Sequence, residues 1–299
     1  MRRYSSRPVT AEPDEHAEGP CWDARTGRLL WIDQYAGLVT VGDFDPAAVQ
    51  VKPARTYPLG SPVGAVVPSR ALGGGWLTAS AQGFAHLAED GAVTPLAQPE
   101  ADTPARTRMN DGKCDALGRF WAGSMAFDTT EGAGSLYRLD PDLTVTVALR
   151  GVTISNGLAW SSDATQLYYI DTPTQRVDRF RIASDGTLHD RTPVLAIEDG
   201  FPDGMCIDDE GCLWVAVWGG HAVRRYSTQG ELLAVVDVDA AQVSSCCFGG
   251  PDGRTLFITT SREGYGAAEL AADPHAGKVF CAAVDVSAPP AAAFGASPS

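Results

Sequence analysis

The 299-residue sequence is short of several kinds of residue, and each shortage excludes a class of protein. It has only three lysines and a net charge of −14, so its acidic surface would repel phosphate backbones, and we expect no nucleic-acid partner. No run approaches the roughly 18 consecutive apolar residues of a transmembrane helix. Residues 1–16 are positively charged at the start but lack the apolar segment of a signal peptide. We therefore expect a cytoplasmic protein without a membrane partner.

Common catalytic and cysteine motifs are also missing. The sequence has no G-x-S-x-G elbow, no phosphate-binding G-x-x-x-x-G-K-[ST] loop and no dinucleotide fingerprint. Its seven cysteines are odd in number and form no C-x-x-C pair, which predicts reduced, mostly buried thiols rather than disulfides or a zinc knuckle. With 44% apolar residues the chain can still bury a substantial core.

A repeat runs along the chain instead. An apolar segment containing glycine is followed each time by a polar turn and a second apolar run, such as LLWI, RFWAG, QLYYI or CLWVAV. Six copies recur at spacings of 42 to 48 residues, which is typical of the blades of a β-propeller. We therefore predict an all-β, six-bladed β-propeller forming a single domain over residues 1–285, with a flexible C-terminal tail over 286–299. The tryptophans in the second runs are predicted to belong to the blade core.

One position of the repeat is unusually polar. In a propeller the first strand of each blade lines the central channel, so equivalent residues meet at one axis. The residue before each glycine, or before Cys246 in the last copy, is Glu18, Val63, Asp111, Asn156, Asp203 and Ser245 in turn. Carboxylates gathered at one place repel one another, and a hard divalent cation bound by their oxygens would remove that repulsion. The pattern thus predicts a metal site in the channel.

Asparagine use supports this interpretation. The chain has only two asparagines: Asn156 occupies the repeated position, and Asn110 directly precedes Asp111. Asn-Gly and Asn-Asp are also ordinary turn sequences. Because Asp and Gly form the turns elsewhere in this chain, we favour a role in the channel.

Several segments carry a family resemblance. AEGPCW, RMNDGKCDALGRFWAGSM, ISNGLAWS, YYIDT, PDGMCIDDEGCLWVA and SSCCFGG occur in order, about one per blade, and resemble the regucalcin/gluconolactonase family, also called senescence marker protein. The resemblance extends from about Glu12 to Val284. It implies a six-bladed propeller that hydrolyses sugar lactones with one divalent cation in its central channel.

The resemblance also implies roles for single residues. The metal ligands would be Glu18, Asn156 and Asp203. Arg108 and Asn110 would bind substrate, as would Asp128, where regucalcin has a longer Glu; Asp111 would neighbour the metal, for example through water.

The expected chemistry is the opening of gluconolactone-like aldonolactones to aldonic acids. A bound cation polarises the lactone carbonyl and stabilises the oxyanion, and Asp203 is our candidate general base. Oxygen ligation suits Ca²⁺, Mg²⁺ or Mn²⁺, but Zn²⁺ or Fe²⁺ would also fit. The alternatives are a non-enzymatic calcium-binding regulator of the regucalcin type and a related propeller esterase or phosphotriesterase. The expected partner is a small sugar lactone, and the chain is expected to be a monomer or a weak homo-oligomer.

Overall fold

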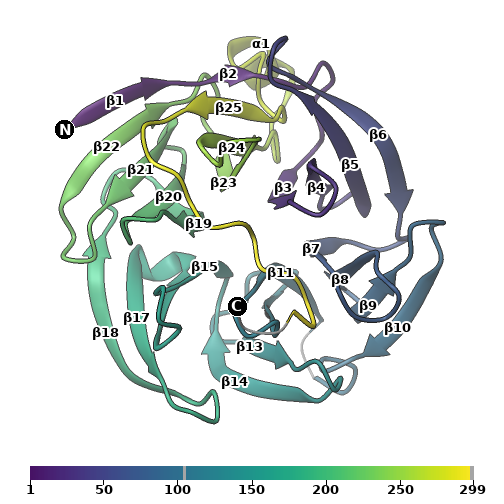
Figure 1. The fold of residues 1–299 in the computed structure, drawn as a ribbon. Coiled ribbons are helices and arrows are strands. Elements are labelled where there is room, and N and C mark those ends of the chain that lie inside the picture. The colour runs from purple at the N-terminus through teal and green to yellow at the C-terminus, as the bar shows by residue number, and fades with distance from the viewer. Residues whose placement is uncertain (104–105, 297–299) are drawn as a thin grey trace.

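A computed structural model describes residues 1–103 and 106–296 of the chain. Six sheets, antiparallel except for one added N-terminal strand, stand around one central axis, which confirms the predicted propeller (Figure 1). The first strand of each blade, which we call the inner strand, contacts the inner strands of the blades beside it. Blades one to three comprise β3 (Ala17–Asp23), β4 (Arg28–Asp33), β5 (Leu38–Asp45) and β6 (Gln50–Pro58); β7 (Val63–Pro68), β8 (Trp76–Ser80), β9 (Gly83–Leu87) and β10 (Val93–Ala97); and β11 (Thr107–Cys114), β12 (Phe120–Ala126), β13 (Gly134–Leu139) and β14 (Val145–Val152).

The second half of the ring repeats this order and includes the start of the chain. Near the N-terminus, β2 (Arg7–Pro8) pairs with the last strand of blade six and so closes the ring. Before it, β1 (Arg2–Ser5) runs parallel to the outermost strand of blade five. Blades four to six comprise β15 (Ser155–Trp160), β16 (Gln166–Asp171), β17 (Arg176–Ile182) and β18 (Leu188–Ala196); β19 (Phe201–Ile207), β20 (Leu213–Trp218), β21 (Ala222–Tyr226) and β22 (Leu232–Asp237); and β23 (Val243–Gly249), β24 (Thr255–Thr260) and β25 (Phe280–Ala283).

Burial explains the composition of the strands. The inner strands β7, β15 and β23 are buried along their whole length, because neighbouring blades cover both of their faces. Most residues of the outer strands β6 and β14 are at least partly exposed. The second-run tryptophans Trp31, Trp76, Trp121 and Trp214 are all buried, which confirms their predicted place in the core.

Buried tryptophans are held by aspartates at the far end of the inner strands. The Trp121 indole N–H donates to Asp115 Oδ2 over 2.7 Å, and Trp214 donates to Asp208 Oδ2 over 2.8 Å. Each aspartate also accepts from an arginine, so the buried indole donors and carboxylates are satisfied. The polar ends of the inner strands are thereby pinned to the second strands.

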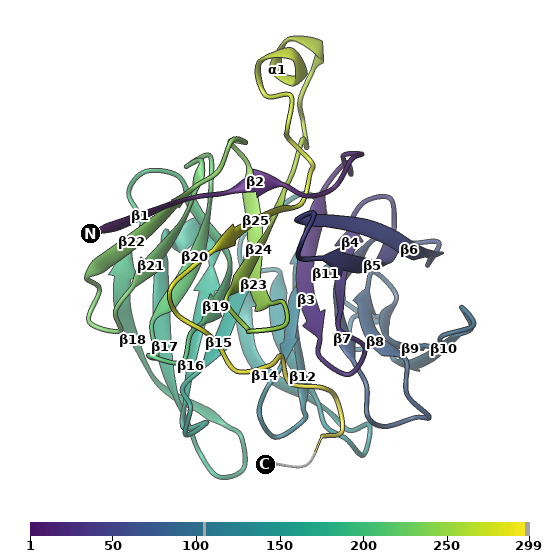
Figure 2. The same ribbon diagram turned by 45° about the horizontal axis from the view of Figure 1, so that its top comes forward.

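The two ends of the ring differ. Antiparallel pairing places the start of each inner strand beside the end of the second strand, as Glu18 beside Ile32 shows; we call this end of the ring the mouth. A long connection after β24 carries the short helix α1 (Ala267–Ala272), which stands away from the blades on this side (Figure 2). A 3₁₀ turn, η1 (Thr172–Thr174), follows β16 at the same end. Within the described ranges, no helix has the length and apolar character required to cross a membrane.

The segment after β25 runs across the opposite end of the ring (Figures 1 and 2). The composition predicts a flexible tail here, but the segment makes backbone hydrogen bonds with three other blades. The Asp209 N–H donates to the Ser287 carbonyl, the Phe294 N–H donates to Pro68, and the Gly295 N–H donates to Gly118. Phe294 is fully buried in the apolar core between blades two and three, and this burial holds the segment against the end of the ring. Residues 297–299 of the predicted tail lie outside the described residues.

Candidate functional site

The polar position of the repeat coincides with an irregularity in each inner strand. Pairing with the second strand shifts at Glu18–Cys21, Val63–Ala65, Met109–Asp111, Asn156–Leu158, Pro202–Met205 and Val243–Ser245. A β-bulge adds a residue to one strand and redirects the neighbouring side chains. All six blades therefore change side-chain direction at the same level, next to the mouth.

The predicted site residues of the inner strands are buried together at this level. Glu18 comes from β3, Asn156 from β15 and Asp203 from β19, while Asp111 and Asn110 come from β11. All five are among the buried polar residues. Their hydrogen bonds and mutual electrostatic effects, described next, show that the structure brings them close to one another.

The carboxyl groups of this cluster disfavour ionisation. Burial and, after it, the neighbouring Asp111 raise the pKa of Glu18 to about 8, against the opposing effects of the Gly19 N–H, Lys113 and Arg108. Burial likewise raises the pKa of Asp111, which Lys113 partly counteracts. The pKa of Asp203 lies well above its usual range because of burial, with Glu18 adding to the effect. Burial is the common cause, and neighbouring carboxyl groups add to it at Glu18 and Asp203.

Asn110 orients Asn156. The Asn110 amide group donates to the Asn156 Oδ1 over 3.0 Å and to the Ser155 carbonyl over 2.9 Å. The Asn156 amide in turn donates to Thr172 Oγ1 over 2.8 Å. These bonds use both amide hydrogens of Asn110 and leave Asn156 Oδ1 with a second lone pair. The only side-chain atom of Asn110 that can still bind a further ligand is its amide oxygen Oδ1, which already accepts from Arg108 over 2.7 Å.

Arg108 is buried beside these amides. Its guanidinium also donates to the Met109 carbonyl, at 3.2 Å, and to the hydroxyl of Tyr35, at 3.3 Å. It lies over the Tyr35 ring, with Cζ at 5.2 Å from the ring centroid. Arg108 thus brings a positive charge to the mouth, next to the carboxyl cluster.

Asp128 lies apart from this cluster. Its carboxylate is exposed in the turn after β12, and Oδ1 accepts from the backbone N–H and the hydroxyl of Thr130, at 3.1 and 2.7 Å. These bonds lower the pKa of Asp128. Within the described part of the chain, no hydrogen bond or ion pair links Asp128 to the other predicted residues, so its role stays a prediction from family resemblance.

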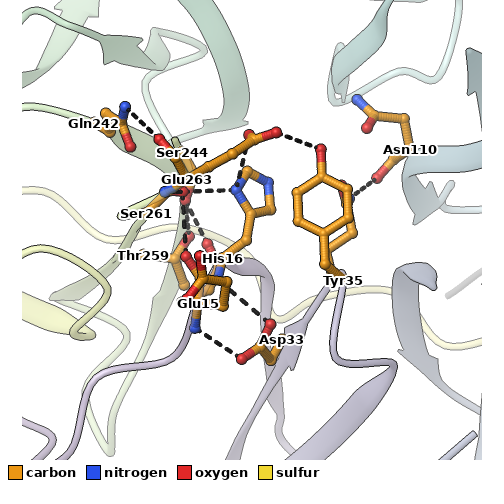
Figure 3. A network of polar contacts seen from close by, with 12 residues as sticks. Glu15, His16, Asp33, Tyr35, Asn110, Gln242, Ser244, Thr259, Ser261 and Glu263 are labelled. Atoms are coloured by element: carbon orange, nitrogen blue, oxygen red, sulfur yellow. Dashed lines mark hydrogen bonds and ion pairs between the residues drawn. The ribbon is translucent and has the colours of Figure 1, made fainter. Parts of the chain in front are cut away.

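The structure adds residues that the repeat did not single out. His16 is buried, and its Nδ1 lies 2.7 Å from Ser261 Oγ and 3.5 Å from Glu263 Oε2. Figure 3 shows His16 between Ser261, Glu263 and Tyr35. Burial and, after it, the charge of Arg108 lower the pKa of His16 to about 3, which favours the neutral imidazole at pH 7. Tyr35, Ser261 and Glu263 all follow the end of a second strand, which is at the mouth. These three residues could have been found in the sequence by examining the first few residues after each second apolar run.

The donor atoms fit a hard cation rather than a soft one. Over residues 1–103 and 106–296, no three His, Cys, Asp or Glu side chains form a group that could hold a metal by themselves. A cation at this level would therefore need the amide oxygen of Asn156 together with the carboxylates of Glu18 and Asp203. Such an all-oxygen set suits Ca²⁺ or Mg²⁺, and a positive ion would relieve the repulsion between the buried carboxylates.

The fold and the site define the class of this protein: it is a six-bladed propeller with acidic, amide and arginine side chains at its mouth. Comparison with known proteins identifies its family. Residues 16–262 match the model of the SMP-30/Gluconolactonase/LRE-like region, and the chain belongs to this family. It is 38% identical to regucalcin of Danio rerio, covering 91% of this chain and 92% of the relative. It is 36% identical to a Bacillus subtilis (strain 168) protein named "Putative sugar lactone lactonase YvrE", covering 90% and 91%.

A solved structure is similar over the whole length. The structure described as a calcium-binding protein, regucalcin, from Agrobacterium tumefaciens superposes with a TM-score of 0.89 at 26% identity. The match covers 99% of this chain and 100% of that one. The resemblance seen in the sequence is thus confirmed.

Proposed function

We propose that this protein is a divalent-cation-dependent hydrolase that opens sugar lactones to aldonic acids. The observation that carries the proposal is the buried set of Glu18, Asn156 and Asp203 at one level of the channel, next to a buried arginine. The family and the name of the Bacillus subtilis relative support the same activity.

The chain's own residues have distinct tasks in this proposal. Glu18, Asn156 and Asp203 hold the cation, which when bound supplies a Lewis acid for the lactone carbonyl. Asp203 accepts the proton of the attacking water, since a carboxylate at the site holds that water within hydrogen-bonding reach. Arg108 and Asp128 bind the sugar hydroxyls. Asn110 contributes by fixing the amide of Asn156, and its carbonyl oxygen remains available to a hydroxyl donor.

The test is acid release from D-glucono-δ-lactone by protein that has been freed of metal with EDTA and then given Ca²⁺, Mg²⁺, Mn²⁺ or Zn²⁺ separately. We expect no turnover above the spontaneous rate without metal, and restored turnover with at least one ion. Asp203→Ala should abolish activity and weaken cation binding, while circular dichroism remains that of the wild type. Wild-type turnover by Asp203→Ala at saturating metal would refute the assignment.

Binding and substrate measurements on the same protein test the two alternative functions. The Danio rerio and Agrobacterium tumefaciens proteins are both called regucalcin, and the second is described as calcium-binding. Calcium binding by calorimetry without any opening of hexono- or pentonolactones would favour a non-enzymatic calcium-binding protein. Turnover of paraoxon or aryl esters in place of lactones would favour a related propeller esterase.

A further inference from the structure

Tyr35 joins two charged groups that come from different blades. Its hydroxyl lies 2.7 Å from Glu263 Oε1 and 3.3 Å from the guanidinium of Arg108. Figure 3 shows the Glu263 carboxylate pointing toward the Tyr35 hydroxyl across the mouth. Tyr35 follows β4 of blade one, Glu263 follows β24 of blade six, and Arg108 lies on β11 of blade three. The three side chains therefore tie three blades together.

Arg108 depends on this tie because it is a buried cation with little else to hold it. Arg108 is 3% exposed, and within the described ranges it forms no ion pair with a carboxylate. Its other hydrogen bonds go to Met109 and Asn110 of its own strand. A buried charge needs hydrogen bonds to compensate for lost water. Tyr35 is the partner that reaches it from another blade, through both its ring and its hydroxyl.

The direction of the hydrogen bonds is fixed by counting protons. A guanidinium only donates, and a carboxylate only accepts, so the single hydroxyl proton of Tyr35 goes to Glu263 and a lone pair faces Arg108. Burial raises the pKa of Tyr35, so the phenol keeps its proton. His16 lies 3.5 Å from the other carboxylate oxygen, Oε2, and Asp203 interacts with Glu263 only through its charge, so Oε1 is free to accept from Tyr35.

Glu263 is held in place through its backbone. Its N–H donates to Ser261 Oγ over 2.9 Å, and its carbonyl accepts from the Gln242 amide over 3.1 Å. The side chain is 43% exposed and is thus positioned by its backbone and by Tyr35 rather than by packing. The chain of bonds from Glu263 through Tyr35 and Arg108 reaches Asn110, whose amide orients Asn156.

We propose that Tyr35 and Glu263 are positioning residues that hold the Arg108 guanidinium in the orientation in which it binds the lactone. This inference rests on the proposed lactone hydrolysis. Without the Tyr35 hydroxyl, Arg108 keeps the aromatic ring but loses the hydrogen bond that sets its rotation. Substrate binding is then the main quantity to weaken, because within the described residues the Tyr35 hydroxyl makes no hydrogen bond with Glu18 or Asp203.

The kinetic test uses Tyr35→Phe. Loss of one hydrogen bond to a charged group should raise KM for D-glucono-δ-lactone about fivefold to tenfold, with kcat within about twofold of wild type. Glu263→Leu should raise KM as Tyr35→Phe does, although it also removes a negative charge that acts on Asp203. Glu263→Gln removes the same charge but keeps an acceptor oxygen, so it should restore most of the loss in KM. The matched control is Tyr57→Phe: the Tyr57 hydroxyl donates to the Glu89 carbonyl over 2.9 Å and Arg55 lies 4.8 Å over its ring, but the pair is on the outer strand β6. An unchanged KM in Tyr35→Phe, or an equal rise in Tyr57→Phe, would overturn the proposal.

A second measurement is independent of turnover. The Nε–Hε resonance of Arg108, assigned by its loss in Arg108→Lys, should be sharp in the wild type and broadened or shifted in Tyr35→Phe and Glu263→Leu, but not in Tyr57→Phe. An unchanged resonance in Tyr35→Phe would refute the positioning role. If the wild type opens no lactone, the proposed function fails, and this spectrum still decides whether Tyr35 and Glu263 position Arg108.

Discussion

Replacing Asn110 with alanine separates two roles for this residue. Family resemblance assigns it to substrate binding, whereas its contacts make it the support of Asn156. Asn110→Ala removes three hydrogen bonds: those with Arg108 at 2.7 Å, the Ser155 carbonyl at 2.9 Å and Asn156 Oδ1 at 3.0 Å. At about 0.5–1.5 kcal/mol for a neutral bond and more for the one to Arg108, the free energy of unfolding should fall by roughly 2–4 kcal/mol.

The functional effect of Asn110→Ala distinguishes the roles. If Asn110 orients Asn156, the variant should bind the activating cation about tenfold or more weakly and lose kcat even at saturating lactone. If Asn110 only binds the sugar, KM should rise while cation affinity remains that of the wild type.

Guanidinium chloride unfolding at fixed metal concentration, calorimetric titration of the cation and steady-state kinetics measure the three quantities. The control is Ser124→Ala in the second strand of the same blade. Ser124 is fully buried and accepts from the Ser135 N–H over 2.9 Å, so the variant should lose stability without losing cation affinity. A fall of less than about 0.5 kcal/mol in the stability of Asn110→Ala, together with unchanged cation affinity, would refute the reasoning.

Three further predictions concern the rest of the chain. Burial raises the pKa of Asp14 from 3.8 to about 6, so the folded protein keeps a proton that the unfolded chain releases. Keeping this proton stabilises the folded state fully below pH 3.8, and the stabilisation is lost as the pH rises through 6. Asp14→Asn still accepts from the Trp31 indole but cannot ionise, so at pH 7 it should be about 1–2 kcal/mol more stable than wild type in urea unfolding, a gain that disappears near pH 4; equal stability at pH 7 would contradict this. Phe294→Ala should lower the free energy of unfolding by about 3–5 kcal/mol, because the fully buried ring anchors the C-terminal segment; a change below about 1 kcal/mol would show that the segment is a loose tail. Asp128→Glu should change the ratio of kcat/KM between hexono- and pentonolactones by about threefold to tenfold if this exposed carboxylate binds a sugar hydroxyl. A ratio that stays within about twofold of wild type would exclude that contact.

The repeat predicted the fold because each copy contains the residue types that the strands and turns of one blade require. A glycine-containing apolar run, a polar turn and a second apolar run define one antiparallel pair, and six copies at nearly equal spacing require a closed ring. The buried inner strands and the buried tryptophans were predictable for the same reason. The position before the glycine also predicted that Glu18, Asp111, Asn156 and Asp203 lie close together, since equivalent positions in a ring meet at its axis.

Only the tertiary structure decided contacts between residues that share no place in the repeat. Tyr35 and Glu263 lie in connections of different length. Nothing in their local sequence shows that the Tyr35 hydroxyl lies 2.7 Å from Glu263 Oε1 and also accepts from Arg108. The two amide hydrogens of Asn110 are assigned to partners only once blades three and four are side by side. The composition of the C-terminal segment predicts a loose tail, yet Phe294 finds an apolar site that forms only when blades two and three pack together. Local sequence thus determines strands and their order, whereas partners from different blades depend on the packing of the whole ring.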